Sequence, residues 1–171
     1  LNREQNAAFR LSCAPLLKHF LDLAVGEADD ATAAARSQLA ELSGIQAEAP
    51  GNGTPPLICM VGEGGTGKSE VIKAITHYAS AWGLHPHVAI TAPTGSAAVL
   101  IGGSTVHSFA GMSSHGKKKP ANVSSAQLAD DPTCAMVLLI VDEVSLISAE
   151  FLGDLSTALK RRRNSQLPFG G

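Results

Sequence analysis

The stretch that most constrains the fold is GEGGTGKS at residues 62–69, because an apolar run precedes it and an amphipathic pattern follows it. The run LICMV at 57–61 is apolar throughout, which predicts a buried strand. The spacing from Gly67 to about Trp82 predicts a helix whose buried face carries Val71, Ile72, Ile75, Ala79 and Trp82. A buried strand, a glycine-rich turn and a helix in this order indicate an α/β protein with a parallel sheet.

Two more apolar runs extend the expected sheet. Residues 88–92 and 137–141 both predict buried strands, and Pro93 ends the first of them. Helices are expected at 94–101 and after Ser148, which can cap a helix with an apolar stripe of Phe151, Leu152, Leu155 and Leu159. Strands that alternate with helices predict a parallel sheet covered by helices on both faces.

The remaining segments predict one helical region and two irregular ones. Residues 1–26 predict helix, with Asn2 as its cap, Gln5 as the capping partner, and Pro15 either kinking it or starting a second helix. Residues 27–56 predict a surface insertion that closes with the linker APGNGTPP. Residues 111–132 are rich in Gly, Ser, Lys and Pro, and they predict a loop.

Composition excludes several classes of protein. The 171 residues are 44% hydrophobic and 16% charged, which indicates a globular domain with a substantial core. The net charge of −2 does not indicate a nucleic-acid partner, so any basic surface has to be local. Cys13, Cys59 and Cys134 lie far apart, which excludes a zinc site or disulfide framework and predicts buried free thiols. No apolar run reaches the roughly 18 residues of a membrane span, so no membrane partner is expected.

The glycine-rich stretch carries the chemistry of a phosphate-binding loop. Its glycines allow backbone N–H groups to approach phosphate oxygens at the positive end of the following helix. Lys68 can reach the β- and γ-phosphates, and the Ser69 hydroxyl can ligate Mg²⁺. The alternative is a glycine-rich turn that binds nothing. The residues expected to bind nucleotide are Gly62, Glu63, Gly64, Gly65, Thr66, Gly67, Lys68 and Ser69.

A pair of acids completes the expected triphosphate site. Asp142 and Glu143 follow the apolar run 137–141, where a parallel sheet presents its strand ends to ligands. Asp142 is expected to hold Mg²⁺, and Glu143 is expected to orient and deprotonate the attacking water. The predicted catalytic residues are therefore Lys68 and Glu143, and the predicted reaction is hydrolysis.

Five stretches of the sequence resemble one family in its order. LNREQNAAF (1–9), GEGGTGKS (62–69), TAPTGSAA (91–98), GGSTVHSF (102–109) and LLIVDEVSLIS (138–148) resemble the first half of the Pif-type DNA helicases, superfamily-one enzymes related to RecD. The closing LPFGG (167–171) is also similar, and the Helitron-type transposon helicases share these motifs. The resemblance implies a partial RecA-like P-loop NTPase domain. It also implies an enzyme that hydrolyses ATP with Mg²⁺ to unwind DNA from five-prime to three-prime.

The resemblance also implies roles for single residues. Gln5 would contact adenine through its amide, the alternative being a helix-capping residue alone. Thr91, Pro93 and Thr94 would contact single-stranded DNA, the alternative being a plain strand-to-helix turn. His107 matches a position of DNA contact or coupling, although a lone His is more often part of a core. The basic runs 117–119 and 160–163 are read as solvated charge and helix-end charge.

The organisation expected from the resemblance is an incomplete motor domain over 1–171. Residues 1–26 would form an adenine-side helical segment, 27–56 an insertion and linker, and 57–171 the core from phosphate loop to metal carboxylate. A second RecA-like domain with an arginine finger is expected beyond residue 171. The strand following LPFGG would lie between 57–61 and 137–141, so these two runs should not pair, and the isolated chain should be marginally stable.

Function and setting follow from the same resemblance, with two alternatives open. The family suggests DNA repair, recombination and telomere maintenance, carried out by a monomeric motor in the nucleus or mitochondrion of a eukaryote. The first alternative is a truncated, non-catalytic remnant. The second is another P-loop NTPase, such as a nucleotide kinase or a transposition ATPase; the arginine lid and acceptor pocket that a kinase usually needs are not evident in the sequence.

Overall fold

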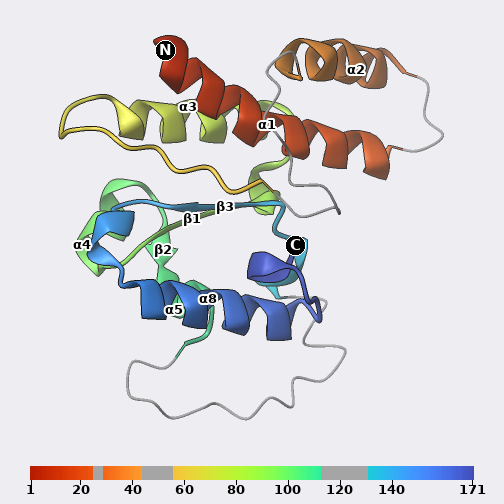
Figure 1. Cartoon of the computed structure of the whole chain (residues 1–171). Helices are drawn as coiled ribbons and strands as arrows, with labels where there is room; N and C mark the ends of the chain where they lie inside the picture. The colour runs from red at the N-terminus through yellow and green to blue at the C-terminus, as the bar shows by residue number, and fades with distance from the viewer. Residues whose placement is uncertain (25–28, 44–55, 113–130) are drawn as a thin grey trace. The chain divides into compact units, whose positions relative to one another are not determined.

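The computed structural model describes residues 1–24, 29–43, 56–112 and 131–171 (Figure 1). The chain forms two compact units, and each is considered separately. The first consists of Leu1–Pro50 and Pro56–Val88, and the second of Gly51–Pro55 and Ala89–Gly171. In the described part of the chain, no helix has both the length and the apolar character that crossing a bilayer requires.

Three helices build the first unit: α1 (Arg3–Leu23), α2 (Asp30–Leu42) and α3 (Lys68–Ala81), followed by the short η1 (His85–His87). Helix α1 packs on both α2 and α3. Two aromatic pairs join α1 to α3 and its end, with Phe9 against Tyr78 at 5.6 Å and Phe20 against Trp82 at 5.2 Å between ring centroids. The side chains fully buried between the helices are Cys13, Leu16, Leu17, Ala35, Val71 and Ala79.

Local sequence explains most of these helix boundaries. The predicted capping box of α1 is present, since the Asn2 side chain accepts from the Gln5 N–H and the Gln5 side chain accepts from the Asn2 N–H. Pro15 lies inside α1 and does not divide it, although it contributes no N–H to the helix. Helix α3 spans nearly the predicted range, and Gly83, at φ 68°, follows its end in the left-handed conformation.

Part of the expected insertion is an ordered helix. Helix α2 begins at the Asp29 cap and packs on α1, and its Gln38 accepts a hydrogen bond of 2.9 Å from the Tyr78 hydroxyl of α3. Alanines at helical spacing allow this close approach, and Ala35 is fully buried. The linker expected at 49–56 lies outside the described residues except for its last, Pro56.

The second unit is a three-stranded parallel sheet with helices. Its strands are β1 (Val88–Ala92), β2 (Ser104–Thr105) and β3 (Leu138–Val141), in the order β2-β1-β3. Strands β1 and β2 pair with Thr91 opposite Ser104 and Ala92 opposite Thr105. The helices are α4 (Gly95–Leu100), α5 (Val106–Phe109), α7 (Pro132–Ala135) and α8 (Ala149–Arg162), with the short turns η2 (Val144–Leu146) and η3 (Pro168–Gly170).

The core of the second unit lies between the sheet and α8. Leu155 and Leu159 of α8 are fully buried with Val106 of α5, and Leu139 and Val141 of β3 pack against them. The predicted stripe of α8 is thus confirmed, as is its cap, because Ser148 Oγ accepts from the Phe151 N–H. Most of the loop expected at 111–132 lies outside the described residues, and its end begins α7.

Two predictions from the sequence are wrong. The run 57–61 is not a strand: Leu57 is 70% and Val61 is 90% exposed, and none of the described strands pairs with it. Apolar composition supplies the propensity for a strand, but a ladder partner is also needed to satisfy the backbone. The second error concerns the thiols, since Cys13 is buried but Cys59 and Cys134 are exposed.

Candidate functional site

The phosphate-loop sequence adopts a turn that only glycine accommodates readily at two positions. Gly65 and Gly67 have φ of 80° and 83°, in the left-handed region. Gly67 is the N-cap of α3 and offers no side chain to its first turn. Among the described residues, no protein acceptor is found for the N–H groups of Lys68 and Ser69, which open the helix. These donors and the positive helix end form an anion-binding arrangement.

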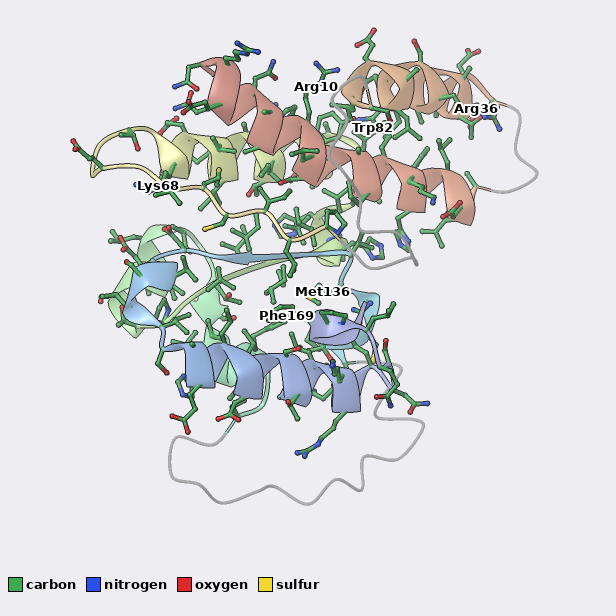
Figure 2. All side chains as sticks on the ribbon, in the orientation of Figure 1. Arg10, Arg36, Lys68, Trp82, Met136 and Phe169 are labelled. Atoms are coloured by element: carbon green, nitrogen blue, oxygen red, sulfur yellow. The ribbon has the colours of Figure 1, made fainter. Side chains whose placement is uncertain are left out.

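Lys68 brings a positive charge to the loop. Its Nζ donates to the carbonyls of Gly62 and Glu63, at 2.7 and 2.9 Å. Figure 2 shows this residue where the loop enters α3. The Thr66 hydroxyl also donates to Glu63 O at 2.9 Å, which closes the turn from within. The loop is therefore folded around its own lysine, with the ammonium group beside the carbonyls of its first two residues.

Gln5 contacts the same loop, which the sequence did not indicate. Its Nε2 donates to Thr66 O at 2.9 Å, while its Oε1 accepts from the Asn2 N–H at 2.8 Å. A Cβ on Gly67 would lie 2.5 Å from Gln5 Nε2, so the glycine is needed for this approach as well as for its φ. The capping role of Gln5 is confirmed. The predicted adenine contact would use the second Nε2 hydrogen and the second lone pair of Oε1.

The predicted acids follow β3 and are oriented by the backbone. Asp142 Oδ1 accepts from the Glu143 N–H at 2.9 Å, and the Asp142 N–H donates to Thr91 O of β1 at 2.8 Å. Asp142 is half-buried, and Glu143 is exposed. Glu143 has φ 51°, a conformation that costs an ordinary residue roughly 1 kcal/mol or more and that often marks functional positions.

The donor groups available for Mg²⁺ fit that ion. A serine hydroxyl and an aspartate carboxylate are hard oxygen ligands, and Mg²⁺ usually takes only one or two protein ligands beside water and phosphate. Ser69 lies in the first turn of α3, and Asp142 has its Oδ2 free of the bond that holds Oδ1. Across the described ranges, no group of three or more His, Cys, Asp or Glu side chains could hold a metal. A fully protein-made metal centre is therefore not seen in this part of the chain.

The structure corrects one of the predicted DNA contacts. Thr91 is fully buried, and its hydroxyl donates to Ile140 O of β3 at 2.9 Å, so it cannot reach a phosphate. Pro93 is half-buried and Thr94 is exposed at the end of β1. Thr94 caps α4, its Oγ1 accepting from the Ala97 N–H, and it shares a hydrogen bond of 3.2 Å with the exposed Ser96 hydroxyl. Ser96 is a polar neighbour that the sequence reasoning did not select.

His107 lies against α8. Its ring is half-buried in α5 and packs on Phe151, with ring centroids 4.6 Å apart. This packing against Phe151 supports the alternative that His107 is part of the core. Contact between the remaining ring surface and DNA stays a prediction.

Two residues of the basic run 160–163, at the end of α8, form internal contacts instead of lying free at the surface. Arg162 pairs with Asp131 and donates from Nη1 to Phe109 O, while Arg163 donates to the carbonyls of Thr133, Met136 and Gly170. These two guanidinium groups hold the chain together, which periodicity could not reveal. The run 117–119 lies outside the described residues.

Comparison with known proteins agrees with these motifs. A family model described as PIF1-like helicase matches residues 40–171. The ATP-dependent DNA helicase RRM3 of Saccharomyces cerevisiae is 37% identical over 113 residues, which cover 64% of this chain and 16% of that protein. The ATP-dependent DNA helicase PIF1 of Danio rerio is 38% identical over 119 residues, covering 67% of this chain and 18% of that protein. The chain thus spans less than a fifth of these relatives.

A solved structure is also similar. The structure of Bacteroides Pif1 bound to ssDNA has a TM-score of 0.49 and 28% identity, covering 63% of this chain and 24% of that one. The family model, by contrast, matches well over half of the chain and includes both the phosphate loop and the acid pair. This chain belongs to the PIF1-like helicase family.

Proposed function

We propose that this chain supplies the ATP-binding and hydrolysing part of a DNA helicase motor. The main support for this proposal is the conformation of the phosphate loop. Gly67 caps α3 in the left-handed conformation, and the Lys68 ammonium donates to Gly62 O and Glu63 O. Family membership supports ATP binding by that loop, since the relatives are named ATP-dependent DNA helicases. The proposed substrates are ATP and DNA, with Mg²⁺ as the metal.

Each residue of the proposed site has one task. The N–H groups of Lys68 and Ser69 and the Lys68 ammonium bind the phosphate oxygens, and Gln5 contacts the adenine. Ser69 and Asp142 would hold Mg²⁺, which supplies charge neutralisation to the phosphates. Glu143 accepts a proton from the attacking water, and its exposed carboxylate on a left-handed backbone is free to do so.

The proposed use of ATP is movement along single-stranded DNA from five-prime to three-prime. The exposed hydroxyls of Thr94, which follows β1, and Ser96, in α4, would contact DNA phosphates beside the half-buried Pro93, and His107 is a second candidate contact. A second RecA-like domain with an arginine finger is proposed for the whole protein. The proposed setting is a monomeric motor in DNA repair, recombination and telomere maintenance, in the nucleus or mitochondrion.

Nucleotide binding tests the site directly. The affinity of the full chain for a fluorescent ATP analogue with Mg²⁺ should fall tenfold or more in Lys68→Ala, since the main charge at the loop is lost. Lys73→Ala is a matched control, because Lys73 pairs with Glu70 on the exposed face of α3. Equal affinities of the two variants would contradict the proposed loop, and no binding by the unaltered chain would favour the non-catalytic remnant.

Turnover tests the chemistry and the partner. Glu143→Gln in the helicase should keep nucleotide binding and lose roughly 10²–10⁴-fold in ATP hydrolysis, the usual contribution of a general base. Single-stranded DNA should stimulate hydrolysis by the unaltered protein. Hydrolysis indifferent to single-stranded DNA would instead favour another kind of P-loop NTPase.

A further inference from the structure

Thr91 lies at the centre of the sheet and joins its strands. It stands opposite Ser104 of β2 on one side, and on the other side it bonds to β3 and to Asp142, the residue that follows β3. Its hydroxyl donates to Ile140 O at 2.9 Å, and its carbonyl accepts from the Asp142 N–H at 2.8 Å. The side chain is fully buried. Thr91 therefore fixes the last part of β3 together with the backbone of the proposed metal ligand.

The hydroxyl is a specific feature and not a consequence of packing. The other residues of β1 are Val88, Ala89, Ile90 and Ala92, none of which has a polar side chain. Valine has nearly the shape of threonine and would fill the same space. A buried hydroxyl is tolerated because it has an acceptor, and here that acceptor is the carbonyl two residues before Asp142.

The connection from Thr91 to the proposed DNA surface is short and stiff. Only Ala92 and Pro93 separate it from Thr94, which is exposed. Ala92 is fully buried and pairs with Thr105, and the ring of Pro93 fixes its φ. We therefore expect a displacement of Thr94 to move Thr91 as well. Thr91 in turn cannot shift along β3 without straining its bonds to Ile140 O and the Asp142 N–H.

We infer that Thr91 is a positioning residue that couples contact of DNA with the Thr94 surface to the placement of Asp142 and Glu143. The inference rests on the proposed function, because it takes the acids as nucleotide-site residues and Thr94 as a DNA contact. Bound single-stranded DNA biases the end of β1, Thr91 carries that bias to β3, and the affinity for Mg²⁺ with nucleotide changes. By linkage, nucleotide changes the affinity for DNA by the same factor.

The test measures this coupling factor in the full chain. The affinity for a fluorescent, slowly hydrolysed ATP analogue with Mg²⁺ is titrated with and without a saturating oligothymidylate, and the affinity for the oligothymidylate is titrated alone. The unaltered chain should show a change of about fivefold or more, the lower end of typical coupling. Thr91→Val should bring the factor close to one, while each ligand binds alone within about twofold of the unaltered chain. Thr91→Ser retains the hydroxyl and should restore the factor.

A measurement on the unaltered chain keeps the inference testable if Thr91→Val does not fold. Hydrogen exchange at the Asp142 amide, which is bonded to Thr91 O, should change when oligothymidylate binds in the absence of nucleotide. The amides of Ala135, the last residue of α7, and Leu152, in the first turn of α8, serve as internal references, and their exchange should change less.

The outcomes separate this inference from the proposed function. A coupling factor in Thr91→Val equal to that of the unaltered chain overturns the inference alone. So does binding of both ligands with no coupling, or an Asp142 amide indifferent to DNA. Absence of Lys68-dependent nucleotide binding overturns the proposed function, and the inference falls with it.

Discussion

Arg162 donates two hydrogen bonds from its guanidinium to one carboxylate oxygen of Asp131, with Nε 2.8 Å from Oδ2. The same guanidinium donates from Nη1 to Phe109 O at 3.2 Å, and Asp131 Oδ1 accepts from the backbone and side chain of Thr133. One side chain at the end of α8 thus ties together the end of α5 and the start of α7, which leads into β3. This ion pair therefore joins α8 to the segment that leads into β3, the strand that Asp142 follows.

Removal of the arginine should destabilise the second unit. The Asp131 side chain is only 5% exposed, so Arg162→Met leaves a buried carboxylate without its partner and should cost about 3 kcal/mol in the free energy of unfolding. Arg161→Met is the control, because Arg161 is exposed on the same helix turn and should change stability by about 0.5 kcal/mol or less. Urea unfolding followed by circular dichroism measures both. Equal losses would mean that the ion pair contributes nothing specific.

Acid should weaken the same contact. Burial alone would raise the pKa of Asp131, but hydrogen bonds from Thr133 and the charge and hydrogen bonds of Arg162 outweigh it, so the pKa lies below its usual value. A carboxyl with a depressed folded-state pKa contributes stability that is complete above its unfolded value, near 3.9, and is lost as pH falls through the folded value. Asp131→Asn should therefore reduce the urea midpoint at pH 6 and differ less from the unaltered chain at about pH 3. A difference that grows on acidification would contradict this assignment.

Gly67 should tolerate substitution less well than Gly64. Gly67→Ala places a Cβ on a backbone with φ 83°, which strains the loop, and brings it to 2.5 Å from Gln5 Nε2, so the Gln5 amide has to move away from its contact. We expect the affinity for the ATP analogue to fall at least tenfold, with roughly 1 kcal/mol lost from stability for the left-handed backbone. Gly64→Ala is the matched control, because nothing lies within 4 Å of its added Cβ. Similar affinities in both variants would show that the loop does not need its observed conformation.

The three cysteines should differ sharply in reactivity. Cys13 is fully buried between α1 and its neighbours, and burial raises the pKa of its thiol to about 12, so almost no thiolate is present at neutral pH. Cys59 and Cys134 are exposed. A maleimide at pH 7 should label Cys59 and Cys134 in the folded chain and reach Cys13 only in denaturant, as peptide mass spectrometry would show. Labelling of Cys13 as fast as Cys59 would mean that α1 opens readily.

Local patterns predicted the elements that carry their own signals. The capping box of Asn2 and Gln5, the Ser148 cap and the helix after Gly67 were all predicted, because caps and apolar stripes act within a few residues. Strand β1 also lies where its apolar run and Pro93 placed it. The run 57–61 failed, because an apolar segment becomes a strand only when another strand supplies its hydrogen bonds.

The sequence by itself predicted the chemistry: the spacing of the glycines, Lys68 and Ser69 is that of a phosphate-binding loop, and two acids follow an apolar run, which together predict a triphosphate site. Only the tertiary structure decided which partners several polar side chains bind. It turned Thr91 inward to Ile140 O, gave Gln5 a contact with Thr66 O, and used Arg162 and Arg163 to hold the fold. The physical reason is that a buried polar group must find a partner, and that partner is supplied by segments distant in sequence.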